Sequence, residues 1–252
     1  MRKIKLIFVF ISFLFLTRMT VYSQNNIDKK AVKGFALLEL YTSEGCSSCP
    51  PSDELLGKLQ SEYKEDNVYI LAFHVDYWDR QGWKDIFSNA DYTKRQYEYA
   101  KYLGKEPIYT PQLIVNGTTE YIGSQETVVR NAIKVALAKP SIVDLSLEAT
   151  LLDTKLNVSY NVNKASKNNR LVLAVVQKSA KSNVKRGENA NRVLSHFQIV
   201  RQLHSVALTG NIKGIVSMSL LKDFNTKEFE IIGFVQNMNF GTILGAKRVT
   251  IN

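Results

Sequence analysis

Two cysteines, three positions apart, constrain this chain more than any other feature. Cys46 and Cys49 are its only cysteines in 252 residues. They follow the apolar run 35–41, which predicts a buried strand, and they precede a segment, 50–59, that has the prolines and spaced leucines of a helix start. A Cys-x-x-Cys at a strand-to-helix turn is typical of a redox-active pair.

At such a turn, Cys46 is expected to be the attacking thiol and Cys49 the one that resolves the mixed disulfide. Unpaired N–H groups of the helix's first turn favour an anion, so they are expected to stabilise a Cys46 thiolate. Cys46 is also expected to be the more exposed thiol.

Two alternatives to a redox-active pair stay open. One is half of a zinc site, although the chain has no second cysteine pair and only three histidines. The other is an inert structural disulfide.

The N-terminal segment 1–23 has the pattern of a secretory signal peptide. Three basic residues precede the apolar run 6–16, and short residues at 21 and 23 stand where a signal peptidase would cleave before Gln24. The remaining chain is therefore expected to be exported, either periplasmic or secreted, with no stable membrane insertion after cleavage. An uncleaved N-terminal anchor is the alternative.

The charge of the chain bears on its partners. The formal net charge is +10, and loss of 1–23, which holds four basic residues and no acidic one, leaves +6. Basic residues gather between Lys178 and Arg186, but the interleaved aromatics of a nucleic-acid site are missing there. No nucleic-acid partner is expected.

Two halves of the chain differ in periodicity. Residues 33–139 alternate strands with helices, and Asn116-Gly117 predicts a hairpin. Right-handed crossovers would place the Cys46 turn at the carboxyl end of the first strand, where open α/β sheets hold their sites. Residues 140–252 instead show short alternating strands. The sequence thus predicts an α/β domain over 33–139, followed by a mostly antiparallel β-sandwich domain over 140–252.

A second element of the site is Thr110-Pro111, which stands directly before a strand and the hairpin. In the cis form, Pro111 would turn the Thr110 backbone toward the Cys46 sulfur, where it could pair with an extended substrate peptide. An ordinary trans proline that opens a strand is the alternative.

These segments resemble the thioredoxin-like superfamily. They resemble more closely a bacterial family of secreted thioredoxin-like proteins catalogued as a domain of unknown function. The likeness rests on the segments 39–53, 74–79, 82–83 and 109–112, and more weakly on 187–190 and 233–236. It implies a thioredoxin-like domain with a helical insertion and a thiol–disulfide role. Gly45 stands where thioredoxins carry a tryptophan, which favours a dedicated partner over general disulfide reduction.

Residues outside the pair are candidates for further roles at the site. Glu39 lies near the place where thioredoxins keep a buried acid that relays the proton of the resolving cysteine. A carboxylate paired with a lysine is the alternative. His74 follows the second strand and would lower the thiolate pKa or contact substrate. A metal site with Asp76 and Asp79, or a hydrogen-bonded loop, stays open as well.

The segment 77–106 is rich in aromatic residues and is expected to form a lid beside the cysteines. At least one of Trp78 and Trp83 is expected to line the substrate cleft. Arg95 and Gln96 are expected on a solvated helix face. His196, in the strand-rich half, is expected to be structural.

The sequence therefore predicts an exported thiol–disulfide oxidoreductase that acts on protein or peptide thiols or disulfides, with no cofactor and no bound metal. The alternative is a non-enzymatic module on the same scaffold, which binds a peptide or a metal ion and keeps its disulfide fixed. The ease with which mild thiols reduce the pair distinguishes the two.

Overall fold

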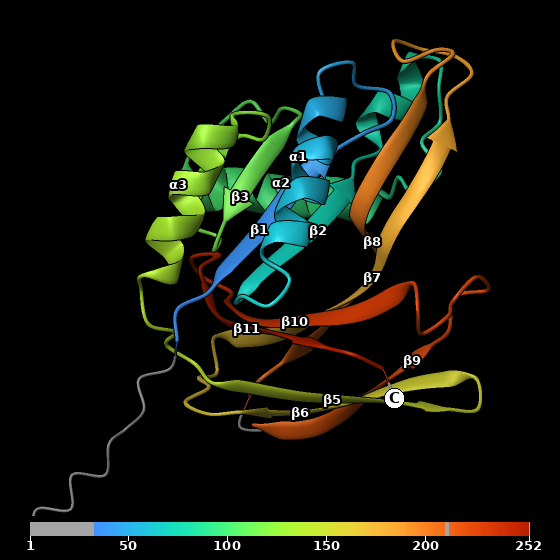
Figure 1. Cartoon of the computed structure of the whole chain (residues 1–252). Coiled ribbons are helices and arrows are strands. Elements are labelled where there is room, and N and C mark those ends of the chain that lie inside the picture. The colour runs from blue at the N-terminus through green and yellow to red at the C-terminus, as the bar shows by residue number, and fades with distance from the viewer. Residues whose placement is uncertain (1–32, 210–211, 252) are drawn as a thin grey trace, which may run out of the picture. The chain divides into compact units, whose positions relative to one another are not determined.

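A computed structural model describes residues 33–209 and 212–251. Three α-helices, one 3-10 helix and eleven strands are found in these residues (Figure 1). In chain order they are β1 (Ala36–Thr42), α1 (Pro50–Glu62), β2 (Val68–His74), η1 (Tyr77–Gln81), α2 (Ala90–Leu103), β3 (Gln112–Val115), β4 (Thr119–Ile122), α3 (Glu126–Leu137), β5 (Leu145–Leu152), β6 (Lys155–Val162), β7 (Asn169–Asn183), β8 (Val193–Ala207), β9 (Lys213–Ser219), β10 (Phe229–Asn237) and β11 (Ile243–Val249).

The strands form a mixed eight-stranded sheet, in the order β11-β10-β7-β8-β2-β1-β3-β4, and a three-stranded sheet, β5-β6-β9. In the larger sheet, β1 and β2 are parallel and β3 is antiparallel to β1. Strands β7, β8, β10 and β11 pair antiparallel with one another. A short parallel contact between Ala72 and Ile199 joins them to β2. The protein is thus an α/β protein with a mixed sheet and few helices.

Helices α1 and α3 lie on one face of β1–β4, and α2 lies on the other (Figure 1). The alternation of side chains along β1 explains this arrangement. Leu38 and Leu40 pack with the leucines of α1, whereas Leu37 and Tyr41 pack with the tyrosines of α2. Each face of the strand is therefore buried, as the continuous apolar run predicts.

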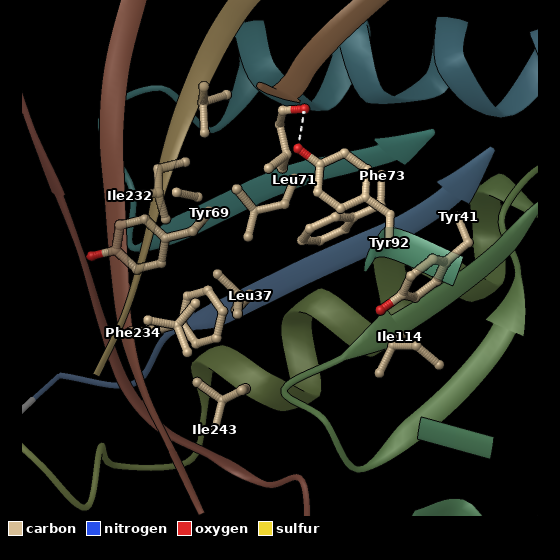
Figure 2. Close-up of a cluster of buried hydrophobic side chains, with 14 of the residues drawn as sticks. Leu37, Tyr41, Tyr69, Leu71, Phe73, Tyr92, Ile114, Ile232, Phe234 and Ile243 are labelled. Carbon is tan, nitrogen blue, oxygen red and sulfur yellow. Dashed lines mark hydrogen bonds between the residues drawn. The ribbon is translucent and has the colours of Figure 1, made fainter. Parts of the chain in front are cut away.

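The core on the α2 side draws on both halves of the chain. Figure 2 shows Leu37 and Phe73 in one cluster with Ile232 and Phe234 of β10. In the same view the Tyr92 hydroxyl donates a hydrogen bond to the carbonyl of Val200 on β8, with 3.0 Å between the oxygens. Residue 140, the predicted domain boundary, therefore separates two segments that share a sheet and a core.

A second core lies between the three-stranded sheet and strands β7 and β10. Leu147 and Val158 from the small sheet pack there with Leu173 and Ile231 from the large one. Burial alternates along β5 and β6, as it should for antiparallel strands with one face in a core.

Local sequence explains several element ends. The side chain of Asn89 accepts a hydrogen bond from the Asp91 N–H and so caps α2, which ends at Gly104 in the left-handed conformation. The predicted hairpin at Asn116-Gly117 is confirmed, since both residues have a positive φ. None of the described helices is long and apolar enough to cross a membrane. The predicted signal peptide, 1–23, lies outside the described residues.

Candidate functional site

The cysteine pair lies in the turn between β1 and α1, at the carboxyl end of β1. Cys46 and Cys49 form a disulfide, with their Cα atoms 5.4 Å apart. Neither cysteine has exposed surface. The prediction that Cys46 is the more exposed thiol is therefore wrong for the oxidised protein.

The cover over Cys46 comes from the loop between β7 and β8, about 140 positions away in sequence. The Asn189 side-chain amide is fully buried and donates to the carbonyls of Glu44 and Cys46, at 2.9 Å each. The Glu188 carboxylate accepts a hydrogen bond of 3.0 Å from the Ser47 N–H. Because one amide satisfies two buried carbonyls, this loop fixes the turn that holds Cys46.

The first turn of α1 offers few free amide donors to a thiolate. Its first two residues are Pro50 and Pro51, which have no N–H. The N–H groups of Ser52 and Asp53 both donate to the carbonyl of Cys49. In the disulfide form, both of these amides are therefore already hydrogen-bonded within the turn. The polar atom near the sulfur is the Ser48 hydroxyl, whose oxygen lies 3.4 Å from the Cys46 Sγ atom.

The Thr110–Pro111 peptide bond is cis, as predicted. The Pro111 carbonyl accepts a hydrogen bond from the Gly123 N–H, and the Gly123 Cα faces the side chain of Ser52 in the first turn of α1. These contacts connect the Thr110 loop to the helix that begins at the cysteines.

Trp78 links the Thr110 loop to the cysteine turn. Its indole N–H donates a 2.8 Å hydrogen bond to the Thr110 hydroxyl, and its Cβ atom packs against Gly45, the residue before Cys46. A side chain at position 45 would be only 3.2 Å from that Cβ atom. The glycine at position 45 therefore leaves the space that the Trp78 side chain occupies.

Trp83 lies on the other side of the turn. Its indole N–H donates to the Glu44 carboxylate at 2.6 Å, and its Cβ packs against Gly187 of the covering loop. Both tryptophans are half-buried. The structure thus brings Trp78 and Trp83 to the cysteine site, one against Thr110 and one against the β7–β8 loop.

His74 lies behind the turn in a buried ion pair. Its Nδ1 atom is 2.7 Å from the Asp85 carboxylate, and both side chains are fully buried. Burial alone would lower the pKa of His74, but the Asp85 charge raises it above its ordinary value. Burial acts to raise the pKa of Asp85, and the His74 imidazolium brings it below the ordinary value. The two groups are therefore a charged pair. In the disulfide form the His74 side chain has no exposed surface.

Three more titratable side chains surround that pair. Asp53 accepts a hydrogen bond from the Thr42 hydroxyl, and burial raises the pKa of Asp53 to about 7. Burial, and then the Asp85 charge, raises the pKa of Glu44. Burial, and then the charge of His74, lowers the pKa of His196 to about 3. In the part of the chain that the structure describes, no group of three such side chains is arranged to hold a metal ion.

Glu39 lies on the opposite face of the sheet from α1. Its carboxylate accepts from the Arg95 Nε atom at 2.6 Å and from the Tyr99 hydroxyl at 2.5 Å. The structure therefore places Glu39 in an ion pair with an arginine of α2 and not beside Cys49. The expectation that Arg95 and Gln96 are solvated is wrong. Both are buried, and Gln96 donates to the Tyr109 carbonyl and to Gln112.

Asp76 and Asp79 hold the loop after β2. Asp76 accepts a hydrogen bond from Thr93, and Asp79 accepts from Ser88 and from the N–H of Asp85. These contacts correspond to the hydrogen-bonded loop that the sequence left open as an alternative to a metal site.

Sequence reasoning missed Asn189, Asp53 and His196 as members of the site. The segment 187–190 carries only a weak family likeness in its sequence. Asp53 is four positions after Cys49, which places both on one face of a helix, and that spacing could have identified it. No local pattern marks His196.

The family model described as "Protein of unknown function (DUF1223)" matches residues 37–236. The chain belongs to this family. Its match includes the cysteine turn, Thr110-Pro111, Asn189 and His196.

Solved structures include similar chains. The structure of an Agrobacterium tumefaciens protein is 27% identical, covers 88% of this chain and 95% of its own, and has a TM-score of 0.66. A domain of the outer membrane lipoprotein Omp28 from Porphyromonas gingivalis is 16% identical over 44% of this chain and 89% of its own, with a TM-score of 0.25. The second likeness is too weak to carry an argument. No curated protein matches.

Proposed function

We propose that this protein is an exported thiol–disulfide oxidoreductase with a thioredoxin-like scaffold followed by a β-sandwich. The strand order β2-β1-β3-β4, with β3 antiparallel, supports the scaffold, because it is the arrangement of a βαβ unit joined to a ββα unit. The export rests on the N-terminal pattern of the sequence. The substrate is a protein or peptide thiol or disulfide.

The observation that carries the proposal is the disulfide at the carboxyl end of β1, with the Thr110-Pro111 loop linked to the cysteine turn through Trp78. A substrate thiolate attacks the Cys46 sulfur, the Cys46–Cys49 bond breaks, and Cys49 leaves as a thiolate. A second substrate thiolate then attacks the substrate sulfur of the mixed disulfide and releases Cys46. The substrate loses two electrons and the cysteine pair gains them. Reduction of a substrate disulfide is the reverse sequence.

Equilibration with glutathione redox buffers tests this function. An exchanging pair should reach equilibrium with glutathione at neutral pH, and a Cys49→Ser variant should trap mixed disulfides with a defined set of partners in whole cells. A potential below roughly −300 mV, together with no trapped partner, would overturn the proposal.

The second candidate is a binding module with a fixed disulfide. The complete burial of both cysteines, and the hydrogen bond from Asn189 that fixes the Cys46 backbone, favour it. In that case the pair should resist mild thiols in the native protein, and a Cys46→Ser, Cys49→Ser double variant should keep its binding.

A further inference from the structure

Each cysteine has a buried acid close to it in sequence. Glu44 precedes Cys46 by two residues, and Asp53 follows Cys49 by one helical turn. Both carboxyl groups are almost fully buried. Each has one oxygen with no hydrogen-bond partner among the described residues, namely Oε1 of Glu44 and Oδ1 of Asp53.

His196 lies between the two acids. Its Nε2 atom is 3.6 Å from Oε1 of Glu44, and its Nδ1 atom is 3.9 Å from Oδ2 of Asp53. The two nitrogens of one imidazole ring thus face different carboxyl groups. The ring is 1% exposed and comes from β8, in the other half of the chain. The Ser182 hydroxyl on β7 lies 2.8 Å from Nε2 and holds the ring in place.

Burial, and then the charge of His74, lowers the pKa of His196 and keeps the ring neutral. The His74 ring is 5.1 Å from the His196 ring, and Asp85 neutralises His74 from the far side. Asp53 also faces the Thr42 hydroxyl of β1 and the charges of His74 and Asp85. Glu44 faces the Trp83 indole and the same two charges. A neutral imidazole has one N–H and one free lone pair. It can therefore accept a proton on one nitrogen and release one from the other.

Both cysteines are fully buried in the disulfide form, which makes buried acids candidate proton donors to the thiolates that reduction produces. We propose that Glu44, His196 and Asp53 form a proton relay that supplies both cysteines of the pair. This rests on the proposed thiol–disulfide function. When Cys49 leaves as a thiolate, the Asp53 carboxylic acid gives it a proton and becomes a carboxylate. Glu44 does the same for Cys46. His196 passes protons between the two acids, so that either acid can be reprotonated by the other. In the reverse direction the carboxylates take the protons back.

The relay explains the burial of the two carboxyl groups, the raised pKa of Asp53 and the position of His196. Burial of two carboxyl groups without full hydrogen bonding is unfavourable. Burial also brings the pKa of Asp53 to about 7, where a carboxylic acid can both give and accept a proton at neutral pH. The relay also explains why a histidine lies between two acids, which packing alone does not explain.

The test is the pH dependence of the reduction rate by dithiothreitol, measured by stopped flow on the full chain between pH 5.5 and 8.5. The variants are Asp53→Asn, Asp53→Glu and His196→Gln. We expect Asp53→Asn and His196→Gln to slow reduction at pH 7 by at least about tenfold and to flatten the profile near pH 7. Asp53→Glu, which keeps an acid, should restore most of the rate. His204→Gln, a half-buried histidine on the same strand that pairs with Leu173, is the matched control and should leave the profile unchanged.

Wild-type profiles for both Asp53→Asn and His196→Gln would overturn the relay. A loss in Asp53→Asn with a normal His196→Gln would also overturn it, because the histidine would then carry no proton. If the His196 variant does not fold, the ¹⁵N shifts of His196 in the wild-type protein decide instead. They should differ between the oxidised and reduced forms, and identical shifts would contradict the proposal. A wild-type pair that dithiothreitol never reduces would refute the proposed function itself, which is a separate outcome.

Discussion

The Nε atom of Arg95 lies 2.6 Å from the Oε2 atom of Glu39, on the face of the sheet that carries α2. The Tyr99 hydroxyl completes the coordination of that carboxylate. The cysteine turn and α1 lie on the other face. Glu39 is therefore in place to stabilise the fold, and the acid nearest to Cys49 in sequence is Asp53.

A Glu39→Gln variant should show whether Glu39 stabilises the fold or relays protons to the cysteines. Loss of one partner of a buried ion pair leaves an uncompensated charge on Arg95, so the free energy of unfolding should fall by about 3–5 kcal/mol. Dithiothreitol should reduce the folded variant at the wild-type rate. Urea unfolding and stopped-flow reduction measure the two quantities. Glu62→Gln, at the exposed pair with Arg130, should change neither. Slow reduction with unchanged stability would return the proton-relay role to Glu39.

The sequence predicted the parts of the site that are close together along the chain. The strand before Cys46, the helix after Cys49 and the hairpin after Pro111 each follow from a local pattern of apolar residues, prolines and Asn-Gly. The structure has all three. Local periodicity also predicted the alternation of strands in the second half.

The missed parts involve contacts between distant residues. The Asn189 side-chain amide donates to the backbone carbonyl of Cys46. Every residue has such a carbonyl, so the sequence near Cys46 gives no sign of this contact. Arg95 looked like a solvated residue because its partner, Glu39, is 56 positions away. Strands β7 and β8 are 15 residues each and extend beyond their apolar runs into polar segments. That extension is what carries His196 and Asn189 to the cysteines.

An Asn189→Ala variant should open the cover over Cys46. The variant loses two hydrogen bonds, worth together about 2 kcal/mol, so the loop should open roughly 30-fold more often. Reduction by dithiothreitol should accelerate by a similar factor. Lys185→Ala, an exposed substitution in the same loop, is the control and should keep the wild-type rate. An unchanged rate in Asn189→Ala would mean that the loop does not limit access to Cys46.

An Asp53→Asn variant should change how stability depends on pH. The folded pKa of Asp53, about 7, lies above its unfolded value of about 3.9, so the folded state binds this proton more tightly. The wild-type protein should therefore lose stability as pH rises from about 4 to 7, and the full penalty is present above pH 7. Relative to wild type, Asp53→Asn should gain on the order of 2–4 kcal/mol between pH 5 and pH 8.

Urea unfolding of the oxidised protein at pH 5, 6.5 and 8 measures this gain. Asp66→Asn, at an exposed site just before β2, is the matched control and should follow the wild-type curve. A stability difference between wild type and Asp53→Asn that is the same at all three pH values would contradict the assignment of a raised pKa to Asp53.

Tryptophan fluorescence should report the redox state of the pair, because the chain has only two tryptophans and both lie at the site. A disulfide quenches a nearby indole, so reduction should brighten the emission. Trp78 packs against Gly45, next to Cys46, and its signal is isolated in a Trp83→Phe variant. That variant should brighten on reduction. The Trp78→Phe variant should brighten less and should also exchange with peptide substrates more slowly, because Thr110 loses the indole that holds it. Equal emission from Trp83→Phe in both redox states, with a normal exchange rate in Trp78→Phe, would show that Trp78 neither senses the disulfide nor positions the Thr110 loop.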